Sequence, residues 1–171
     1  LESEIYQVDS NSPIYSEEEN IKDPLIDNGW IIDPLDGTSN FLQGIKYQAI
    51  SLAKIEKGEI KYAIVIDLEN FDVYTAIKDN GARLNNLEIE KKRVVINLLG
   101  ASTGFIKALK ENHDVKIPKG INFRLLGSQS LQLCFVATGQ LMGNVSLEAK
   151  AWDDVAGALI VREAGGYYSN C

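Results

Sequence analysis

The sequence predicts one layered α+β domain, on two observations. Apolar and polar residues alternate with a period of two along consecutive segments in the first half of the chain, as in half-buried strands. Helical patterns, with apolar residues three and four positions apart, stand separately, mostly in the second half. Runs of strands with separate helices favour an α+β arrangement over a dinucleotide-binding alternation. The length of 171 residues fits a single domain, which we expect to span residues 1–171.

Strands are predicted first at residues 30–32, an apolar run that we expect to end at Asp33-Pro34. Further strand patterns lie at residues 50–55, 60–67, 71–77, 93–98 and 141–147. Short connections join the first three of these, which predicts an antiparallel meander. Helical patterns lie at residues 1–8, 103–110, 129–138 and 155–164. We expect Ser128 to cap the third of these helices and Asp153 or Asp154 to cap the fourth.

The composition indicates a folded protein with an excess of negative charge. Hydrophobic residues make up 45% and charged residues 24% of the chain, as in an ordinary packed protein. The formal net charge of −7 repels nucleic-acid phosphates and anionic membranes. We therefore expect no nucleic-acid partner and no membrane partner. The sequence shows neither a secretory signal nor an apolar run long enough to cross a membrane, so we expect a cytoplasmic location.

Four other features have ordinary structural interpretations. Cys134 lies in an apolar segment and Cys171 is the last residue, so the pair fits neither a disulfide framework nor a zinc site. We expect a buried thiol and a terminal one. His113 has no ligand-spaced partner and is expected in solvent. The basic residues 91–93 lead into an apolar segment and fit the charged edge of a strand.

Acidic residues that could bind a metal follow the first predicted strand. Asp33 and Asp36 are three residues apart in a turn, so both carboxylates and the Leu35 carbonyl can face one point. Oxygen ligands of this kind bind a hard divalent cation. If a helix starts at Thr38, the backbone N–H groups of Gly37 and Thr38 can bind phosphate beside the metal.

Each acidic segment also has a purely structural explanation. Asp-Pro and Asp-Gly are common turn pairs, in which the aspartate hydrogen-bonds to the backbone. The run Glu17–Glu19 fits a solvated face. Asp153-Asp154 fits the N-cap of a helix. Taken one at a time, the segments leave ligand and structural roles open.

Taken together and in this order, the segments resemble the inositol monophosphatase superfamily of lithium-sensitive, magnesium-dependent phosphatases. Residues 30–41, WIIDPLDGTSNF, match the pattern W-h-I-D-P-h-D-G-T-x-N-F at every specified position, where h is apolar. Residues 152–166, WDDVAGALIVREAGG, match a second pattern, W-D-x-x-A-G-x-x-h-x-x-E-A-G-G, without gaps. The upstream glutamate motif corresponds to residues 16–18, SEE. The resemblance runs from about residue 14 to residue 166.

The resemblance implies a role for each residue of the motifs. Two or three Mg²⁺ ions would be held by Glu17, Asp33, the Leu35 carbonyl, Asp36 and Asp153. Mn²⁺ is an alternative metal, and Li⁺ and Ca²⁺ would inhibit. The catalytic residues would be Glu17, Thr38 and Asp36, with Thr38 and Glu17 beside the attacking water. The N–H groups of Gly37 and Thr38 would bind the substrate phosphate.

The sequence also departs from the family pattern. Family chains begin with helices that carry a water-orienting aspartate and continue past the last helix with another strand and helix. We therefore expect an α-β-α-β-α sandwich that is incomplete at both ends. The glutamate that binds sugar hydroxyls is replaced by Ser146, and the nearest carboxylate is Glu148. Ser128 and Gln129 fall where the family contacts the substrate ring.

The implied function is that of a Mg²⁺-dependent phosphomonoesterase, usually a homodimer, that hydrolyses a small phosphorylated alcohol by two- or three-metal activation of water. Inositol 1-phosphate is the default substrate. One alternative is a 3′(2′),5′-bisphosphate nucleotidase that acts on phosphoadenosine phosphate, and fructose 1,6-bisphosphate is a further possible substrate. Another alternative, suggested by the missing aspartate, is a non-catalytic metal-binding protein on the same scaffold.

Overall fold

The computed structural model describes residues 2–19, 26–90, 94–112 and 116–169. The helices are α1 (Glu2–Val8), the 3-10 turn η1 (Glu17–Glu19), α2 (Thr38–Gln43), α3 (Thr103–Glu111), α4 (Gln129–Ala137) and α5 (Ala151–Glu163). The strands are β1 (Ile14–Ser16), β2 (Asn28–Asp36), β3 (Ala49–Glu56), β4 (Glu59–Asp67), β5 (Val73–Ile77), β6 (Ala82–Leu84), β7 (Leu87–Glu88), β8 (Leu98–Ala101), β9 (Asn122–Arg124) and β10 (Gly143–Val145). None of the helices in these ranges has the length and apolar character needed to cross a bilayer.

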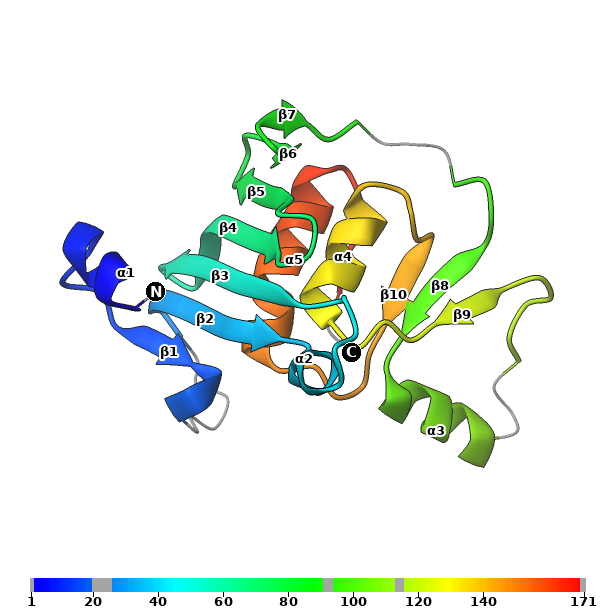
Figure 1. The fold of residues 1–171 in the computed structure, drawn as a ribbon. Helices are drawn as coiled ribbons and strands as arrows, with labels where there is room; N and C mark the ends of the chain where they lie inside the picture. Colours follow the sequence, from blue (N-terminus) through cyan, green and yellow to red (C-terminus); the bar gives the residue numbers. More distant parts are fainter. Residues whose placement is uncertain (1, 20–25, 91–93, 113–115, 170–171) are drawn as a thin grey trace.

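These elements form alternating layers of helix and sheet (Figure 1). A seven-stranded sheet, in the order β1 to β7, and a three-stranded sheet, in the order β10-β8-β9, enclose α4 and α5. Helix α1 packs on the outer side of the large sheet, and α3 packs on the small sheet, where Phe105 contacts Phe123. The predicted α-β-α-β-α sandwich is confirmed.

The large sheet is built around the predicted meander. Each pair of consecutive strands from β2 to β7 is antiparallel, whereas β1 runs parallel to β2. The prediction that the first strand ends at Asp33-Pro34 is wrong, because β2 continues to Asp36. Its register with β3 shifts between Asp33 and Asp36. Pro34 lies in this irregularity, since it has no N–H to donate to the ladder.

Two other sequence predictions need correction. The segment 94–97 forms no strand and Val95 is 90% exposed, so the strand predicted at 93–98 begins only at Leu98. Helix α5 begins at Ala151 with Lys150 as its N-cap, rather than with Asp153 or Asp154. Asp153 instead accepts a hydrogen bond from the Lys150 N–H at 2.7 Å, which satisfies a donor at the start of the helix. The cap of α4 at Ser128 is confirmed.

The core lies between the large sheet and the helix pair. Leu131 of α4, Ile160 of α5 and Val65 of β4 are each fully buried there. Cys134 is buried in the same cluster, as predicted. The predictions for residues 91–93, His113 and Cys171 lie outside the described residues.

A polar cluster fixes the start of the chain against the large sheet. Lys54, 6% exposed, donates to the carboxylate of Asp9 and to the hydroxyl of Ser12, and lies 4.9 Å from the ring centre of Trp30. The Trp30 indole N–H donates to Asp9 at 3.0 Å. These hydrogen bonds hold the pKa of Asp9 well below its usual range. Directly after this segment β1 pairs with β2, and Glu17 follows β1 at the start of η1.

Candidate functional site

The three aspartates of the two long motifs meet at one point. Asp33 and Asp36 come from the end of β2, and Asp153 comes from the first turn of α5. Each offers a carboxylate oxygen within 4.8 Å of the others. Asp33 is 1% exposed and Asp36 is 7% exposed. Carboxylates gathered at this distance inside a protein form a ligand set suited to a hard divalent cation.

Backbone and ladder contacts bring these segments together. The Leu35 N–H donates to Oδ1 of Asp33 at 2.9 Å. This is the backbone hydrogen bond that an aspartate makes in a turn, so Asp33 has this structural role as well as its place in the cluster. Ser51 pairs with Asp33 in the ladder between β2 and β3. Its hydroxyl donates to the Trp152 carbonyl at 3.1 Å. Ser51 therefore connects the start of α5 to the strand that carries Asp33.

Burial and mutual repulsion disfavour the charged forms of these acids. Burial raises the pKa of Asp33 to about 8, helped by the charges of Asp36, Glu17 and Asp153 and opposed by the hydrogen bond from Leu35. Burial also raises the pKa of Asp153 to about 6, against the hydrogen bond from the Lys150 N–H.

The aspartates have no cationic partner among the described residues to offset this repulsion. Within the described ranges, no lysine or arginine forms an ion pair with any of the three aspartates. A bound divalent ion would supply the positive charge that the cluster lacks, so the residues present fit a metal site.

Asp36 is held by the N-terminus of α4. Its Oδ2 accepts hydrogen bonds from the Ser128 hydroxyl at 2.7 Å, from the Ser130 N–H at 2.7 Å and from the Ser130 hydroxyl. Its Oδ1 accepts only one described hydrogen bond, from the Gln129 N–H at 3.2 Å. Oδ1 is therefore the oxygen with capacity left for a cation.

Sequence reasoning missed Ser130. The sequence signal for Ser130 was its place two residues after the N-cap, Ser128. A side chain in the first turn of a helix can reach a group that lies beyond the helix end.

Glu17 stands apart from the three aspartates. It begins the 3-10 turn η1 and is exposed. Its charge still contributes to the raised pKa values of Asp33 and Asp153. The Thr38 hydroxyl donates to the Leu35 carbonyl at 3.0 Å, which joins two of the predicted site residues directly.

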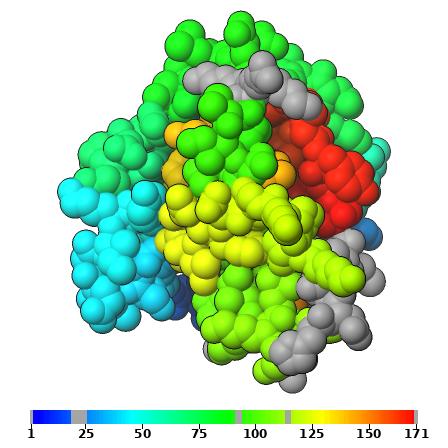
Figure 2. Space-filling model, turned by 90° about the vertical axis from the view of Figure 1, so that its right-hand side faces the viewer, coloured from blue at the N-terminus to red at the C-terminus, as the bar shows by residue number. Residues whose placement is uncertain are grey.

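The segment that follows Asp36 turns sharply into α2. Gly37 is the N-cap of α2 with φ +97°, and a Cβ at this position would lie 2.7 Å from the Tyr47 carbonyl oxygen. Only glycine fits both the conformation and the close approach. Asn40 on α2 donates to the carbonyls of Tyr47 at 2.8 Å and of Leu126 at 2.7 Å. In Figure 2, α2 and the loop after it, in cyan, border the yellow segment that leads into α4.

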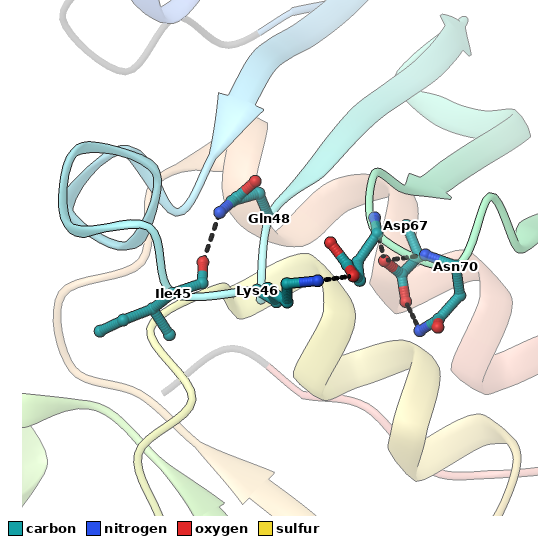
Figure 3. A network of polar contacts seen from close by, with 6 residues as sticks. Ile45, Lys46, Gln48, Asp67 and Asn70 are labelled. Carbon is teal, nitrogen blue, oxygen red and sulfur yellow. Dashed lines mark hydrogen bonds and ion pairs between the residues drawn. The ribbon is translucent and has the colours of Figure 1, made fainter.

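The loop after α2 is anchored at its other end as well. Lys46 forms an ion pair with Glu69, and the Gln48 side chain donates to the Ile45 carbonyl (Figure 3). Asp67 fixes the turn that carries Glu69, since it accepts from the Glu69 N–H at 2.8 Å. These contacts anchor the loop that connects α2 to β3.

A cavity of about 280 Å³ opens beside Asp36 and Asp153. Its lining includes all four of the predicted substrate-contacting residues, Ser128, Gln129, Ser146 and Glu148. All four side chains already make hydrogen bonds, since Ser128 donates to Asp36 and Ser146 accepts from the Glu148 N–H. The Glu148 carboxylate accepts from the Gly104 N–H at the start of α3, and the Gln129 amide hydrogen-bonds to Asp154 and Asn144.

Comparison with known proteins identifies the family. Residues 3–171 match the model of the inositol monophosphatase family. The chain belongs to this family.

Individual relatives of the inositol monophosphatase family support the assignment. The Nus factor SuhB of Pasteurella multocida is 37% identical over 148 residues, which cover 80% of this chain and 54% of that protein. The inositol-1-monophosphatase of Rhizobium meliloti is 39% identical over 147 residues, which cover 81% of this chain and 55% of that enzyme. The chain spans about half the length of the curated relatives it matches.

A solved structure confirms the fold. The crystal structure of the extragenic suppressor protein suhB from Bartonella henselae superposes with a TM-score of 0.80 at 28% identity. The alignment covers 95% of this chain and 66% of that one.

Proposed function

We propose that this chain carries the catalytic site of a Mg²⁺-dependent phosphomonoesterase that acts on a small phosphorylated alcohol, with inositol 1-phosphate as the default substrate. The observation that supports this most directly is the meeting of Asp33, Asp36 and Asp153 within 4.8 Å, without a compensating lysine or arginine in the described ranges. Membership of the inositol monophosphatase family supports the same reaction class.

The residues that would hold the metal ions are Asp33, Asp36 through Oδ1, Asp153, the Leu35 carbonyl and Glu17. When bound, two or three such ions lower the pKa of a water molecule and stabilise charge on the attacking and leaving oxygens. Mn²⁺ could replace Mg²⁺ in an all-oxygen ligand set.

The neighbouring residues would bind the phosphate and orient the water. Gly37 has no side chain to occupy the N–H groups at the start of α2, so these groups can donate to phosphate oxygens. Thr38 already donates its hydroxyl proton to Leu35, which leaves its oxygen able to accept a hydrogen bond from the attacking water. The exposed Glu17 carboxylate can take up the proton that this water loses.

The cavity favours a substrate with one phosphate over a bisphosphate. Its lining contains the hydroxyls of Ser102, Thr103, Ser128 and Ser146 and the carboxylate of Glu148, and no lysine or arginine among the described residues. Hydroxyls can hydrogen-bond to the hydroxyls of a polyol. A second phosphate would meet a carboxylate without a neutralising cation, which disfavours phosphoadenosine phosphate and fructose 1,6-bisphosphate.

A second candidate function comes from the relatives named Nus factor SuhB, one of which is 37% identical to this chain. On this candidate the scaffold would serve as a Nus factor, alone or in addition to catalysis. The absence of a nucleic-acid partner, inferred from the net charge, stays a prediction, as do lithium inhibition, the homodimer and the cytoplasmic location.

Phosphate release from three substrates tests the proposal. The purified chain is incubated with Mg²⁺ and inositol 1-phosphate, phosphoadenosine phosphate or fructose 1,6-bisphosphate. We expect turnover of inositol 1-phosphate that stops with a chelator, with Li⁺ and in Asp36→Asn. Turnover that is indifferent to chelator contradicts the metal site, and preference for either bisphosphate contradicts the substrate class.

A further inference from the structure

A chain of hydrogen-bonded amides runs through the protein behind the site. The side chain of Asn40 donates to the Leu126 carbonyl at 2.7 Å, and the Leu126 N–H donates to Oε1 of Gln132 at 3.1 Å. Gln132 donates in turn to Oδ1 of Asn144 at 2.9 Å. The contacts therefore connect α2, the loop before α4, α4 itself and β10.

The chain ends at a carboxylate. Asn144 donates to Oε1 of Gln129 at 2.9 Å, and Gln129 donates to Oδ1 of Asp154 at 2.7 Å. Each of the three side-chain amides, Gln132, Asn144 and Gln129, thus accepts from the donor before it and donates to the acceptor after it. The Asp154 carboxyl accepts the last of these hydrogen bonds, which fixes the direction in which the three side-chain amides are turned.

Its last two members are connected to both halves of the aspartate cluster, since the Gln129 N–H donates to Asp36 and Asp154 is the sequence neighbour of Asp153. Gln129 lies between Ser128 and Ser130, whose hydroxyls hold Asp36. Asp154 directly follows Asp153 on α5. The hydrogen bond between the Gln129 and Asp154 side chains therefore links the segment that holds Asp36 to the helical turn that carries Asp153.

We propose that Gln129 and Asp154 are positioning residues that fix the spacing of Asp36 and Asp153 for divalent metal binding. This inference rests on the proposed function. It also gives Gln129 a role different from the substrate contact predicted from the sequence, because both polar atoms of its amide are engaged away from the cavity. Partners that orient metal ligands in this way commonly control metal affinity.

A double-mutant cycle on the full chain tests the proposal, with Mg²⁺ alone as the probe in isothermal titration calorimetry. Gln129→Met removes both hydrogen bonds at similar side-chain length, and Asp154→Ala removes the terminal acceptor. We expect each single variant to raise the Kd for Mg²⁺ roughly 10-fold. The double variant should bind no more weakly than Asp154→Ala alone, because the two residues act through one contact.

A matched control and a second readout separate positioning from general stability. Gln140→Met removes a glutamine that accepts from Thr138 at the other end of α4, and its Kd for Mg²⁺ should equal that of the parent. In activity assays, Gln129→Met should raise the Mg²⁺ concentration for half-maximal rate and leave the substrate KM unchanged. A merely structural role would lower the metal-free unfolding midpoint in Gln129→Met and Gln140→Met alike and leave both Kd values unchanged.

Asp154→Asn covers the case in which the larger substitutions do not fold. It keeps the size of the side chain and one acceptor oxygen but adds N–H donors, so the direction of the hydrogen-bonded amides is no longer fixed. We expect a smaller rise in the Kd for Mg²⁺ than in Asp154→Ala. An unchanged Kd in Gln129→Met or Asp154→Asn, or fully multiplicative effects in the double variant, overturns the positioning role. Absence of Mg²⁺ binding by the parent chain would instead contradict the proposed function itself.

Discussion

Ser130 lies 94 positions after Asp36 in the sequence, yet its N–H donates to Oδ2 of Asp36 at 2.7 Å and its hydroxyl donates to the same oxygen. A carboxylate of the proposed metal site is therefore also the anion that occupies the N-terminus of α4. The contact serves both partners, because the helix end has unpaired N–H groups and the buried carboxylate needs donors.

Ser130→Ala should lower the free energy of unfolding by about 2 kcal/mol, because it removes a hydrogen bond to a buried charged group. The N–H contact of residue 130 remains, so the fold should be kept. Urea unfolding measures the change. Ser10→Ala is the control, since Ser10 is exposed, and its stability should match that of the parent. Equal stability of the two variants would show that the hydroxyl contributes nothing to holding Asp36.

Gly127 and Gly44 provide a second comparison, because both have positive φ, +80° and +68°. A Cβ on Gly127 would lie 2.7 Å from Nδ2 of Asn40, whereas a Cβ on Gly44 would meet nothing within 4 Å. Gly44→Ala should therefore cost only the conformational strain, about 1 kcal/mol. Gly127→Ala should cost about 3 kcal/mol, because Asn40 must also move. Urea unfolding of both variants checks this, and equal losses would contradict the close approach.

The sequence was sufficient to predict features that depend on neighbouring residues or on a long motif. The strand patterns along β3, β4 and β5 and the short connections between them predicted the antiparallel meander. In the structure each of these strands packs against α5. The helix capped by Ser128 followed from a cap residue and apolar spacing. The convergence of Asp33 and Asp36 with Asp153 came from the family resemblance, since nothing in the spacing of these residues shows that β2 and α5 meet.

The contacts that hold the aspartates in place were not predictable. Ser130, Asn144 and Asp154 act through partners on other elements, and local sequence does not encode such pairs. The sequence indicates Asp153 or Asp154 as the cap of α5, because aspartate is a common N-cap. In the structure Lys150 takes that place and Asp153 reaches back to its N–H. This frees the first turn of α5 to present a carboxylate to the cluster.

The pH dependence of stability should have an unusual sign in the metal-free chain. The folded pKa values of about 8 for Asp33 and about 6 for Asp153 lie above the ordinary value of 3.8. The folded chain therefore keeps protons that the unfolded chain has released, and the free energy of unfolding should fall as pH rises from about 4 to about 8. Urea unfolding across this range in the presence of chelator measures the slope.

Two variations test the cause of this slope. Saturating Mg²⁺ binds the ionised carboxylates and should raise stability most at the alkaline end, by about 2.7 kcal/mol when its concentration is 100-fold above its Kd. Asp33→Asn should flatten the metal-free profile between about pH 4 and pH 8, since the amide carries no proton to lose. If the free energy of unfolding of the metal-free chain rises with pH over this range, the pKa values of Asp33 and Asp153 are not raised in the folded state.

The exposure of Glu17 separates metal binding from turnover. Because Glu17 lies outside the group formed by Asp33, Asp36 and Asp153, Glu17→Gln should retain calorimetric Mg²⁺ binding at the aspartates and lose roughly 100-fold in kcat, the typical loss when a proton acceptor is removed. Asp36→Asn should lose both. Glu18→Gln makes the same charge change at the next exposed position and should retain both properties. Loss of all Mg²⁺ binding in Glu17→Gln would place this glutamate among the principal ligands, and unchanged kcat would exclude it from the reaction.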